Sequence, residues 1–309
     1  MPELADAERL LRDRLGAQLR VGFPLAPLTS FRIGGPAALF VEADDDGALE
    51  AVGRAVSQTG VPVMVIGKGS NVLVSDEGFP GVVVRLGRGY RWAGRDGARL
   101  TAGGAMPLPA LAGVAMRHRL AGLEFGVAIP ASLGGAVKMN AGAHGRSMSE
   151  VIERIDIYSL SRGARLSFSA DEAGFAYRRS SLPSGGIVVG AVARLEIGEE
   201  EHIRAHMEEA RDWRRRTQPL AEPNCGSVFK NPDGDHAARL IEEAGGKGLR
   251  LGGAQVSPKH SNFIVADPGA SASDVWQLIE RVRALVEAHA GIRLETEVEL
   301  MGAVGDAQP

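Results

Sequence analysis

The chain has 309 residues, of which 44% are hydrophobic and 24% charged, the composition of an ordinary soluble globular protein. One hydrophobic core rarely keeps growing to this length, so we expect two or more domains. The formal net charge of −3 argues against nucleic acid as a main partner, because it leaves no basic excess to neutralise phosphates. Residues 1–20 lack a long apolar run, so we expect neither a signal peptide nor membrane insertion.

Cysteine and glycine usage narrow the class further. The single cysteine, Cys225, excludes an intrachain disulfide and fits a reducing compartment, so we expect a cytoplasmic protein. The 41 glycines are about twice the average usage of ~7%. They follow no collagen-like or low-complexity period, which predicts turns and close approaches of the backbone to a ligand.

The first part of the chain has an α/β pattern. A leucine stripe predicts a helix within residues 1–20, and a strand is expected over Ala37–Glu42. Asp44-Asp45-Asp46 suits the start of a second helix, which should end at Gly60. The β-rich run Val61–Ile66 then leads directly into a glycine-rich loop.

Strands dominate from about Tyr90 to Glu196. Asp96-Gly97 and Arg162-Gly163 lie between β-like segments and predict hairpins. A helix is expected near Leu108–Arg119. Another, over Glu201–Gln218, is stopped by Pro219 and marks a plausible domain boundary.

The last hundred residues have their own α/β pattern. A helix near His236–Ala244 precedes a strand over Asn262–Ala266. Ser271 and Asp274 form a capping-box pattern for a long helix. A final strand over Ile292–Leu300 alternates apolar residues with charged ones.

Two small-residue loops are candidates for holding a cofactor. Gly67-Lys68-Gly69-Ser70-Asn71 follows a strand and can turn several N–H groups toward an anion, although it matches neither the Rossmann nor the Walker pattern. The second, Gly126–Ala136, contains Gly134-Gly135 and is followed by Asn140-Ala141-Gly142. A simple turn would explain the first loop, and close helix–strand packing the second. Together they favour one extended cofactor held along both.

Three further segments carry reactive groups. The turn Asn224–Pro232 presents a hydroxyl, an ammonium and an amide; alternatively, its polar side chains bond only to their own backbone. Tyr177-Arg178 offers a guanidinium that matches a carboxylate, whereas Arg179 is more simply a surface charge. Glu295, Glu297 and Glu299 share one strand face, and their spacing does not say which of them matters.

Histidine and cysteine positions point away from metal or thiol chemistry. His144 and His260 have no partners at metal-ligand spacing, so no metal is expected. No segment pairs a histidine convincingly with Cys225, which makes thiol catalysis an unattractive hypothesis.

With these segments in order, the chain resembles the UDP-N-acetylenolpyruvoylglucosamine reductases, flavoenzymes of peptidoglycan precursor synthesis, from about Thr29 to Gly302. The motifs that carry the resemblance are Ser30-Phe31-Arg32-Ile33-Gly34-Gly35, Gly67-Lys68-Gly69-Ser70-Asn71, Ile129-Pro130 with Gly134-Gly135-Ala136, Met139-Asn140-Ala141-Gly142-Ala143, Tyr177-Arg178, Gly226-Ser227-Val228-Phe229-Lys230-Asn231-Pro232 and Glu295-Thr296-Glu297-Val298. Each is weak alone, but their joint order is highly specific. The chain looks like the compact, type II form of the family.

The resemblance implies an α+β fold in which a vanillyl-alcohol-oxidase/PCMH-type FAD-binding domain, built of two α/β subdomains, precedes a smaller α/β substrate-binding domain. The corresponding division is an N-terminal helix in residues 1–20, the FAD domain in 21–198, the substrate domain in 199–303 and a tail in 304–309. Ser70-Asn71 stands where covalent relatives carry a histidine, so dissociable FAD is expected. The other implied partners are small molecules, NADPH and a UDP-sugar, and we expect a monomer.

The resemblance also assigns roles to residues. Hydride reaches the vinyl carbon of the enolpyruvyl group, Arg178 and Glu297 hold and polarise the carboxylate, and Ser227 donates a proton to the adjacent carbon. The residues expected to bind FAD are Arg32, Gly67, Lys68, Gly69, Ser70, Asn71, Ile129, Pro130, Ser132, Gly134, Gly135, Asn140, Ala141 and Gly142. Those expected to bind substrate are Tyr177, Lys230, Asn231, Gln255, His260 and Asn262. Two alternatives are another sugar or alcohol oxidoreductase of the same superfamily and a non-redox nucleotide-sugar binding protein.

Overall fold

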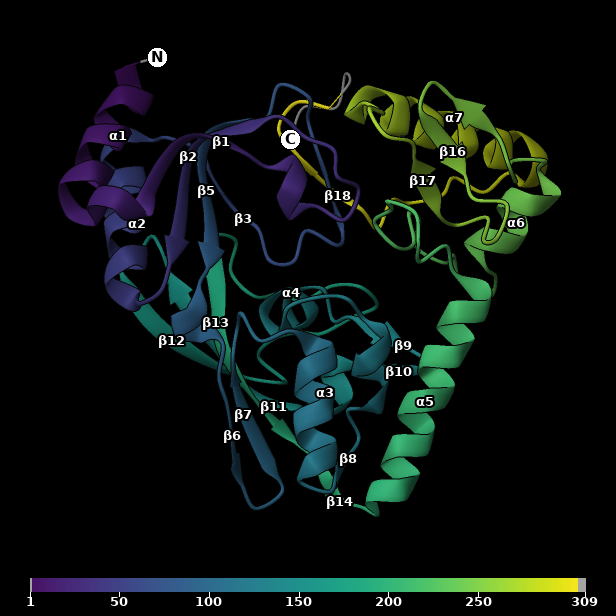
Figure 1. Ribbon diagram of the computed structural model, residues 1–309, viewed down its shortest axis with the longest axis horizontal. Coiled ribbons are helices and arrows are strands. Elements are labelled where there is room, and N and C mark those ends of the chain that lie inside the picture. The colour runs from purple at the N-terminus through teal and green to yellow at the C-terminus, as the bar shows by residue number, and fades with distance from the viewer. Residues whose placement is uncertain (1, 305–309) are drawn as a thin grey trace. The chain divides into compact units, whose positions relative to one another are not determined.

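The computed structural model describes residues 2–304, which form two compact units (Figure 1). Unit 1 contains residues 2–21, 38–68 and 81–213, and unit 2 contains 22–37, 69–80 and 214–304. Both units are therefore discontinuous along the chain, whereas the predicted division at 21–198 and 199–303 is contiguous. Those boundaries stay a prediction about which segments hold cofactor and which hold substrate. Residues 305–309 of the predicted tail lie outside the described part.

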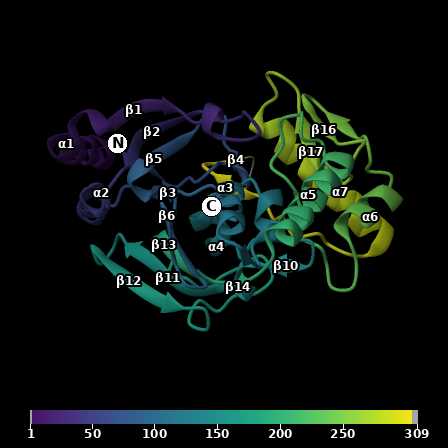
Figure 2. The ribbon, with the colours of Figure 1, turned by 60° about the horizontal axis from the view of Figure 1, so that its bottom comes forward.

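Unit 1 begins with two helices, α1 (Pro2–Leu15) and α2 (Asp46–Thr59), which lie side by side (Figures 1 and 2). The Asp45 carboxylate caps α2 by accepting from Ala48 N at 2.9 Å, and Gly60 ends it with φ of 73°, both as predicted. The helices share a buried cluster with a four-stranded sheet. Its order is β1 (Leu19–Pro24), β2 (Pro36–Ala43), β5 (Phe79–Leu86) and β3 (Val63–Val65), with β3 and β5 parallel.

A second, antiparallel sheet forms the rest of unit 1. Its order is β12 (Ala164–Ser169), β11 (Ile152–Ser159), β13 (Gly186–Arg194), β7 (Arg99–Gly103) and β6 (Ala93–Asp96). The predicted hairpins are confirmed, with Gly97 and Gly163 at φ of 57° and 61° in the two turns. Apolar residues of this sheet share one core with α3 (Leu108–Arg117) and α4 (Leu133–Lys138) (Figure 2).

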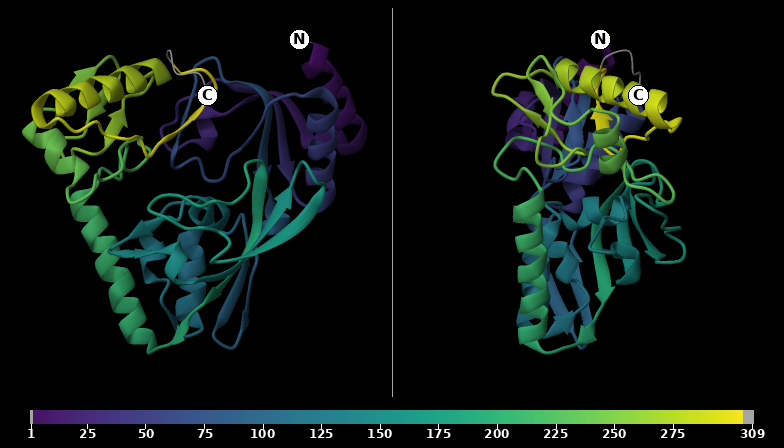
Figure 3. Two further views of the ribbon diagram at one scale, coloured as in Figure 1. Left: turned by 180° about the vertical axis from the view of Figure 1, so that it is seen from behind. Right: turned by 90° about the vertical axis from the view of Figure 1, so that its right-hand side faces the viewer.

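Short elements complete unit 1. They are η1 (Gly16–Gln18), η3 (Arg88–Tyr90), η4 (Glu124–Ala128), η5 (Met148–Glu150) and the strand pairs β8 (Leu120–Ala121) with β14 (Glu196–Ile197) and β9 (Gly142–Ala143) with β10 (Arg146–Ser147). The long helix α5 (Glu200–Thr217) matches its predicted extent (Figure 3). Its buried residues Ile203, Met207 and Ala210 belong to the core of unit 1. The division between the units falls within this helix, after Trp213.

Unit 2 packs the helix α7 (Ala272–Ala290) on a three-stranded antiparallel sheet (Figure 3). The sheet has the order β15 (Arg250–Leu251), β16 (Ala254–Val256) and β17 (Ile264–Ala266). The predicted capping box of Ser271 and Asp274 is present, and Gly291 ends α7 in the left-handed region. The remaining elements are η2 (Ala26–Leu28), α6 (Ala237–Glu243) and the parallel pair β4 (Val72–Val74) with β18 (Glu299–Met301).

The predicted final strand is only partly regular. Leu294 and Val298 are buried while Glu295 and Glu299 are exposed, as the alternation predicted, but Glu297 of the charged face is partly buried. Residues 292–298, however, form no continuous ladder; Thr296 makes an isolated bridge to Phe229, and regular pairing begins at Glu299. This part of the chain therefore pairs first with Phe229, through Thr296, and then with β4, from Glu299 onward.

None of the helices in residues 2–304 is long and apolar enough to cross a membrane.

Asp76 joins two distant segments of unit 2. Its carboxylate accepts from the backbone N–H groups of Ala272, at 2.8 Å, and of Ser273, at 3.2 Å, so it caps α7 from 196 residues away in sequence. Unpaired N–H groups at a helix start and the helix dipole both favour a carboxylate there.

We predict that Asp76→Ala lowers the free energy of unfolding by about 1–2 kcal/mol, because two helix-terminal donors lose their acceptor. Asp76→Asn should retain part of the effect, since one oxygen still accepts. Urea denaturation measures both, with the exposed Asp13→Ala in α1 as control. Equal midpoints for Asp76→Ala and wild type would contradict the prediction.

Candidate functional site

The segment that contains Ser227 is held between two other segments of unit 2. An Asx turn precedes it, in which Gly226 N donates to Asn224 Oδ1 at 2.9 Å, and Gly226 has φ of 81°. On one edge, Val228 N donates to Asn262 O at 2.9 Å. On the other edge, Val228 O accepts from Glu297 N at 2.7 Å. Backbone hydrogen bonds therefore bring the Ser227 and Glu297 segments together across 70 residues of sequence.

Burial distinguishes the three glutamates that sequence spacing could not separate. Glu295 and Glu299 are exposed, whereas Glu297 is partly buried.

The Cys225 thiol lies close to Glu297. Burial raises the pKa of this thiol, and the nearby charge of Glu297 raises it further. Cys225 is 2% exposed and packs in the apolar core of unit 2, as expected of an inert thiol.

Lys230 pairs with a glutamate of the neighbouring segment. Its Nζ lies 3.3 Å from Glu295 Oε2, in a salt bridge whose carboxylate side chain is 75% exposed. Such a pair contributes little stability but restrains the ammonium. A role for Lys230 in easing the ionisation of Ser227 stays a prediction.

The other expected substrate residues of unit 2 make hydrogen bonds within the unit. Asn231 Oδ1 accepts from Ala237 N at 3.1 Å, at the start of α6. Gln255 Nε2 donates to Gly248 O at 3.2 Å. His260 stacks edge-on against the Phe263 ring at 4.7 Å, and its burial lowers the pKa of the imidazole. Their contact with substrate also stays a prediction.

In unit 1, Tyr177 and Arg178 occupy the tip of a tight turn. Ala176 and Arg179 exchange two backbone hydrogen bonds, of 2.9 and 3.1 Å, and Arg178 has φ of 54°. The Arg178 Nη2 donates to Gly142 O at 3.0 Å, and the guanidinium lies 5.1 Å from the centre of the Tyr177 ring. The arginine side chain is thus oriented by its own turn and by the loop after α4.

Asn140 ties that turn to the loop after α4. Its Nδ2 donates to Ala176 O at 3.0 Å, and its Oδ1 accepts from Ser149 N at 2.9 Å. The side chain is buried, and both ends of its amide serve the protein. Sequence reasoning assigned Asn140 to the cofactor; the structure gives its side chain a bracing contact with the turn of Arg178.

Backbone strain is concentrated at predicted site residues. Among the described residues, the non-glycine positions with positive φ are Arg32, Arg119, Asn140, His144 and Arg178. Arg32, Asn140 and Arg178 belong to the predicted site. Such conformations cost on the order of 1–3 kcal/mol and persist where the surroundings enforce them, often at functional sites. No residue pattern in the sequence predicts this strain.

The first glycine loop presents unpaired donors. The backbone N–H groups of residues 67–71 donate to no acceptor within residues 2–304. The loop is held in place through a carbonyl group: Gly69 O accepts two hydrogen bonds from Ser30, one from its N at 2.9 Å and one from its Oγ at 3.2 Å. Ser30 thereby connects the loop to the strained turn that ends at Arg32. A run of unpaired N–H groups suits an anion such as a diphosphate.

The second loop meets the first at one point within unit 1. A Cβ on Gly67 would lie 2.6 Å from Ser132 Oγ, so the two loops touch there. Ser132 also caps α4 by accepting from Gly135 N at 3.3 Å. Gly134, in contrast, is explained by packing, because a Cβ there would lie 2.9 Å from Val188 O. The unpaired N–H groups of the first loop and the contact of Gly67 with Ser132 fit FAD. Contacts of Lys68, Ile129, Pro130 and Ala141 with it stay predictions.

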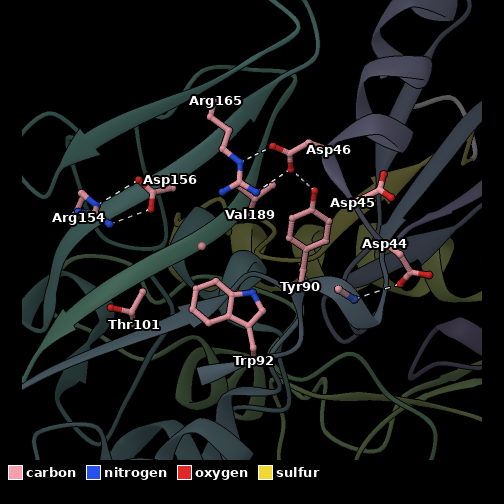
Figure 4. A pocket seen from close by; sticks show the side chains of 12 residues that line it. Asp44, Asp45, Asp46, Tyr90, Trp92, Thr101, Arg154, Asp156, Arg165 and Val189 are labelled. Atoms are coloured by element: carbon pink, nitrogen blue, oxygen red, sulfur yellow. Dashed lines mark hydrogen bonds and ion pairs between the residues drawn. The ribbon is translucent and has the colours of Figure 1, made fainter. Parts of the chain in front are cut away.

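A cavity of about 340 Å³ lies elsewhere in unit 1, beside the start of α2 (Figure 4). Its charges are paired within the protein: Arg165 Nη2 and Tyr90 OH both donate to Asp46, at 2.8 and 2.5 Å. Arg165 lowers the pKa of Asp46, and burial raises that of Tyr90. None of the predicted site residues lines this cavity, and its lining gives no sign of a ligand.

Comparison with known proteins identifies the class and then the family. A family model described as an FAD binding domain matches residues 37–169. The structure of a BBE-like protein from Physcomitrella patens aligns with a TM-score of 0.55 at 11% identity, over 91% of this chain and 88% of that one, which is a likeness of fold alone. The protein is therefore an α+β flavoprotein with a PCMH-type FAD domain, as predicted.

The family follows from closer relatives. The model for the C-terminal domain of UDP-N-acetylenolpyruvoylglucosamine reductase matches residues 218–301. The reductase of Heliobacterium modesticaldum is 48% identical, over 91% of this chain and 90% of its own. That of Halalkalibacterium halodurans is 41% identical, over 98% and 99%. The crystal structure of the Thermus caldophilus reductase aligns with a TM-score of 0.79 at 37% identity, over 92% and 98%. The chain belongs to the UDP-N-acetylenolpyruvoylglucosamine reductases, which confirms the resemblance.

We predict that Gly69→Ala weakens FAD binding about 10-fold or more, equivalent to about 1.4 kcal/mol. Gly69 has φ of 60°, and a Cβ there would lie 2.1 Å from the backbone oxygen of Leu28, so the loop must move. Gly163→Ala is the matched control, since its φ is 61° with nothing within 4 Å of a Cβ. The two variants share the left-handed strain, roughly 1–2 kcal/mol, but only the first has the clash.

Titration of the FAD-stripped variants with FAD, followed by flavin fluorescence, measures the affinity. Equal affinities for Gly69→Ala and Gly163→Ala would show that the packing of Gly69 against Leu28 does not shape the cofactor loop.

Proposed function

We propose that this chain is the NADPH-dependent, FAD-containing reductase that converts the enolpyruvyl ether of UDP-N-acetylglucosamine to UDP-N-acetylmuramate, a step of peptidoglycan precursor synthesis. The observation that carries this conclusion is the identity of 41–48% to reductases of that name over at least 90% of the lengths of both chains. The two glycine-containing loops, residues 67–71 and 126–136, would hold FAD, which would supply the hydride chemistry that links NADPH to the terminal vinyl carbon of the substrate.

The protein must then stabilise charge on the substrate. Hydride at the terminal carbon leaves an electron pair on the carbon that bears the ether oxygen and the carboxylate. A guanidinium beside that carboxylate favours this enolate-like state, which is the role proposed for Arg178. Glu297 orients the carboxylate group from unit 2. The support for Arg178 is its restrained turn, and for Glu297 its partial burial next to the Ser227 segment.

The reaction is completed by a proton. The Ser227 hydroxyl donates it to the carbon beside the carboxylate, forming the C–H bond of the lactyl ether, and the resulting alkoxide recovers a proton from solvent. Serine is a poor acid in water, so its environment must ease ionisation. We assign this to Lys230, which lies three residues after Ser227 in the same segment and whose ammonium is restrained by Glu295.

We also infer a cytoplasmic monomer. The support for the cytoplasm is a single cysteine with a buried thiol and substrates that are small, charged molecules. Sedimentation equilibrium of the FAD-loaded protein tests the monomer, with a dimeric mass as the contrary result.

The activity itself is tested by following NADPH absorbance in the presence of the purified flavoprotein. We expect oxidation of NADPH to require the enolpyruvyl UDP-sugar and to give UDP-N-acetylmuramate. Colourless protein with no affinity for FAD would favour the non-redox alternative, and rapid flavin reoxidation by oxygen alone would favour an oxidase.

We predict that Ser227→Ala slows turnover by ~10² or more while flavin reduction by NADPH stays near the wild-type rate, because only the proton donor is lost. Stopped-flow absorbance of the flavin measures the reductive step separately. Ser184→Ala, an exposed serine of unit 1, is the control and should match wild type in both measurements. Unchanged turnover in Ser227→Ala would remove Ser227 from the mechanism.

A further inference from the structure

We propose that Asn262 is a positioning residue that sets the place of Ser227, and that its side chain does not bind the substrate. The proposal rests on the function proposed above and deepens it. It also revises the sequence prediction, which placed Asn262 among the substrate-binding residues.

The geometry of the Asn262 amide carries the proposal. Phe229 N donates to Asn262 Oδ1 at 2.9 Å, and Asn262 Nδ2 donates to Phe229 O at 2.8 Å. Asn262 is 4% exposed. One side chain thus makes the reciprocal pair of hydrogen bonds that a neighbouring strand would make, and little of it is left for a ligand.

The Asn262 side chain supplies the hydrogen bonds that the polar backbone groups of Phe229 would otherwise lack. The strand-like segment beginning at Ser227 is bonded along its other edge to residues 295–297. On the near edge, Val228 N donates to the main-chain oxygen of Asn262 at 2.9 Å, and the amide side chain then takes both polar groups of Phe229. The two residues that directly follow Ser227 are therefore fixed by Asn262.

Asparagine suits this place, whereas aspartate and alanine do not. The amide presents a donor and an acceptor side by side, at the reach of a peptide group. Aspartate would keep the acceptor but place an oxygen against Phe229 O, and alanine would leave both groups of a buried peptide unpaired. His260 also restrains the backbone of Asn262, because its Nδ1 accepts from Asn262 N at 3.2 Å.

The consequence for the reaction is a displacement of the proton donor. A shift of about 1 Å in a catalytic group can cost ~10² in rate. We therefore expect Asn262→Asp to slow reoxidation of the reduced flavin by the enolpyruvyl UDP-sugar by about 10–100-fold. The reductive step with NADPH should stay within about twofold of wild type, since it does not involve Ser227. The dissociation constant of the UDP-sugar should change by less than the reoxidation rate does.

The experiment compares Asn262→Asp and Asn262→Ala in the FAD-loaded enzyme by stopped flow, with flavin absorbance and thermal unfolding as checks of folding. Ser261→Ala is the matched control: Ser261 is also 4% exposed and adjacent in sequence, but its Oγ donates to Glu242 at 3.2 Å and not to the Ser227 segment. It should show a near-normal rate of reoxidation.

A double-mutant cycle separates positioning from general damage. If Asn262 acts through Ser227, Asn262→Asp should change the reoxidation rate of Ser227→Ala by less than about twofold. An equal loss in both backgrounds would overturn the proposal, as would a weaker dissociation constant for the UDP-sugar at an unchanged rate. If the wild-type protein fails to oxidise NADPH with this substrate, the proposed function itself is wrong.

Discussion

The hydrogen bonds on either side of Val228 are the constraint on which the candidate site depends. One edge of this short segment binds residues 295–297 and the other binds Asn262, so three separate parts of unit 2 form one small sheet-like cluster. Backbone hydrogen bonds of this kind set positions to within a few tenths of an ångström, which a surface loop alone cannot do. The cluster places a hydroxyl and a partly buried carboxylate on adjoining segments of the chain.

In unit 1 the Arg178 turn is positioned by strained backbone and by a side chain. Arg178 and Asn140 both adopt positive φ, and Asn140, in the loop after α4, donates a hydrogen bond to Ala176 O in the turn that carries Arg178. In each unit a buried asparagine uses both the oxygen and the nitrogen of its amide in hydrogen bonds. Asn140 thereby holds the turn of Arg178 in unit 1, and Asn262 holds the segment of Ser227 in unit 2. Asparagine suits this task because its amide imitates a peptide group while its short side chain loses little entropy on burial.

Local features of the fold could be predicted from the sequence, and long-range ones could not. The caps at Asp45 and Ser271 were correct because a cap depends on three or four neighbouring residues. The predicted cofactor and substrate domains are contiguous in sequence, whereas residues 22–37 and 69–80 group in space with the C-terminal part of the chain. That grouping depends on distant contacts such as the one between Asp76 and α7.

The same distinction applies to the site. Ser227 and Arg178 were singled out by the chemistry of their turns. Spacing did not distinguish Glu295, Glu297 and Glu299; the resemblance assigned the role to Glu297, and the structure shows that Glu297 is the partly buried one. At Gly134 the structure shows the close packing that the sequence left open as an alternative, and its contact with FAD stays a prediction. The resemblance placed Asn262 among the substrate-binding residues. Its hydrogen bond with Phe229, 33 residues away in sequence, is visible only in the structure.

The most direct test of this account is a crystal structure of the FAD-loaded protein with the enolpyruvyl UDP-sugar. It should place Ser227 Oγ about 3 Å from the carbon beside the carboxylate, with Arg178 and Glu297 at the carboxylate and Asn262 still bonded to Phe229. A serine oxygen turned away from that carbon, or Asn262 bonded to the sugar, would contradict it.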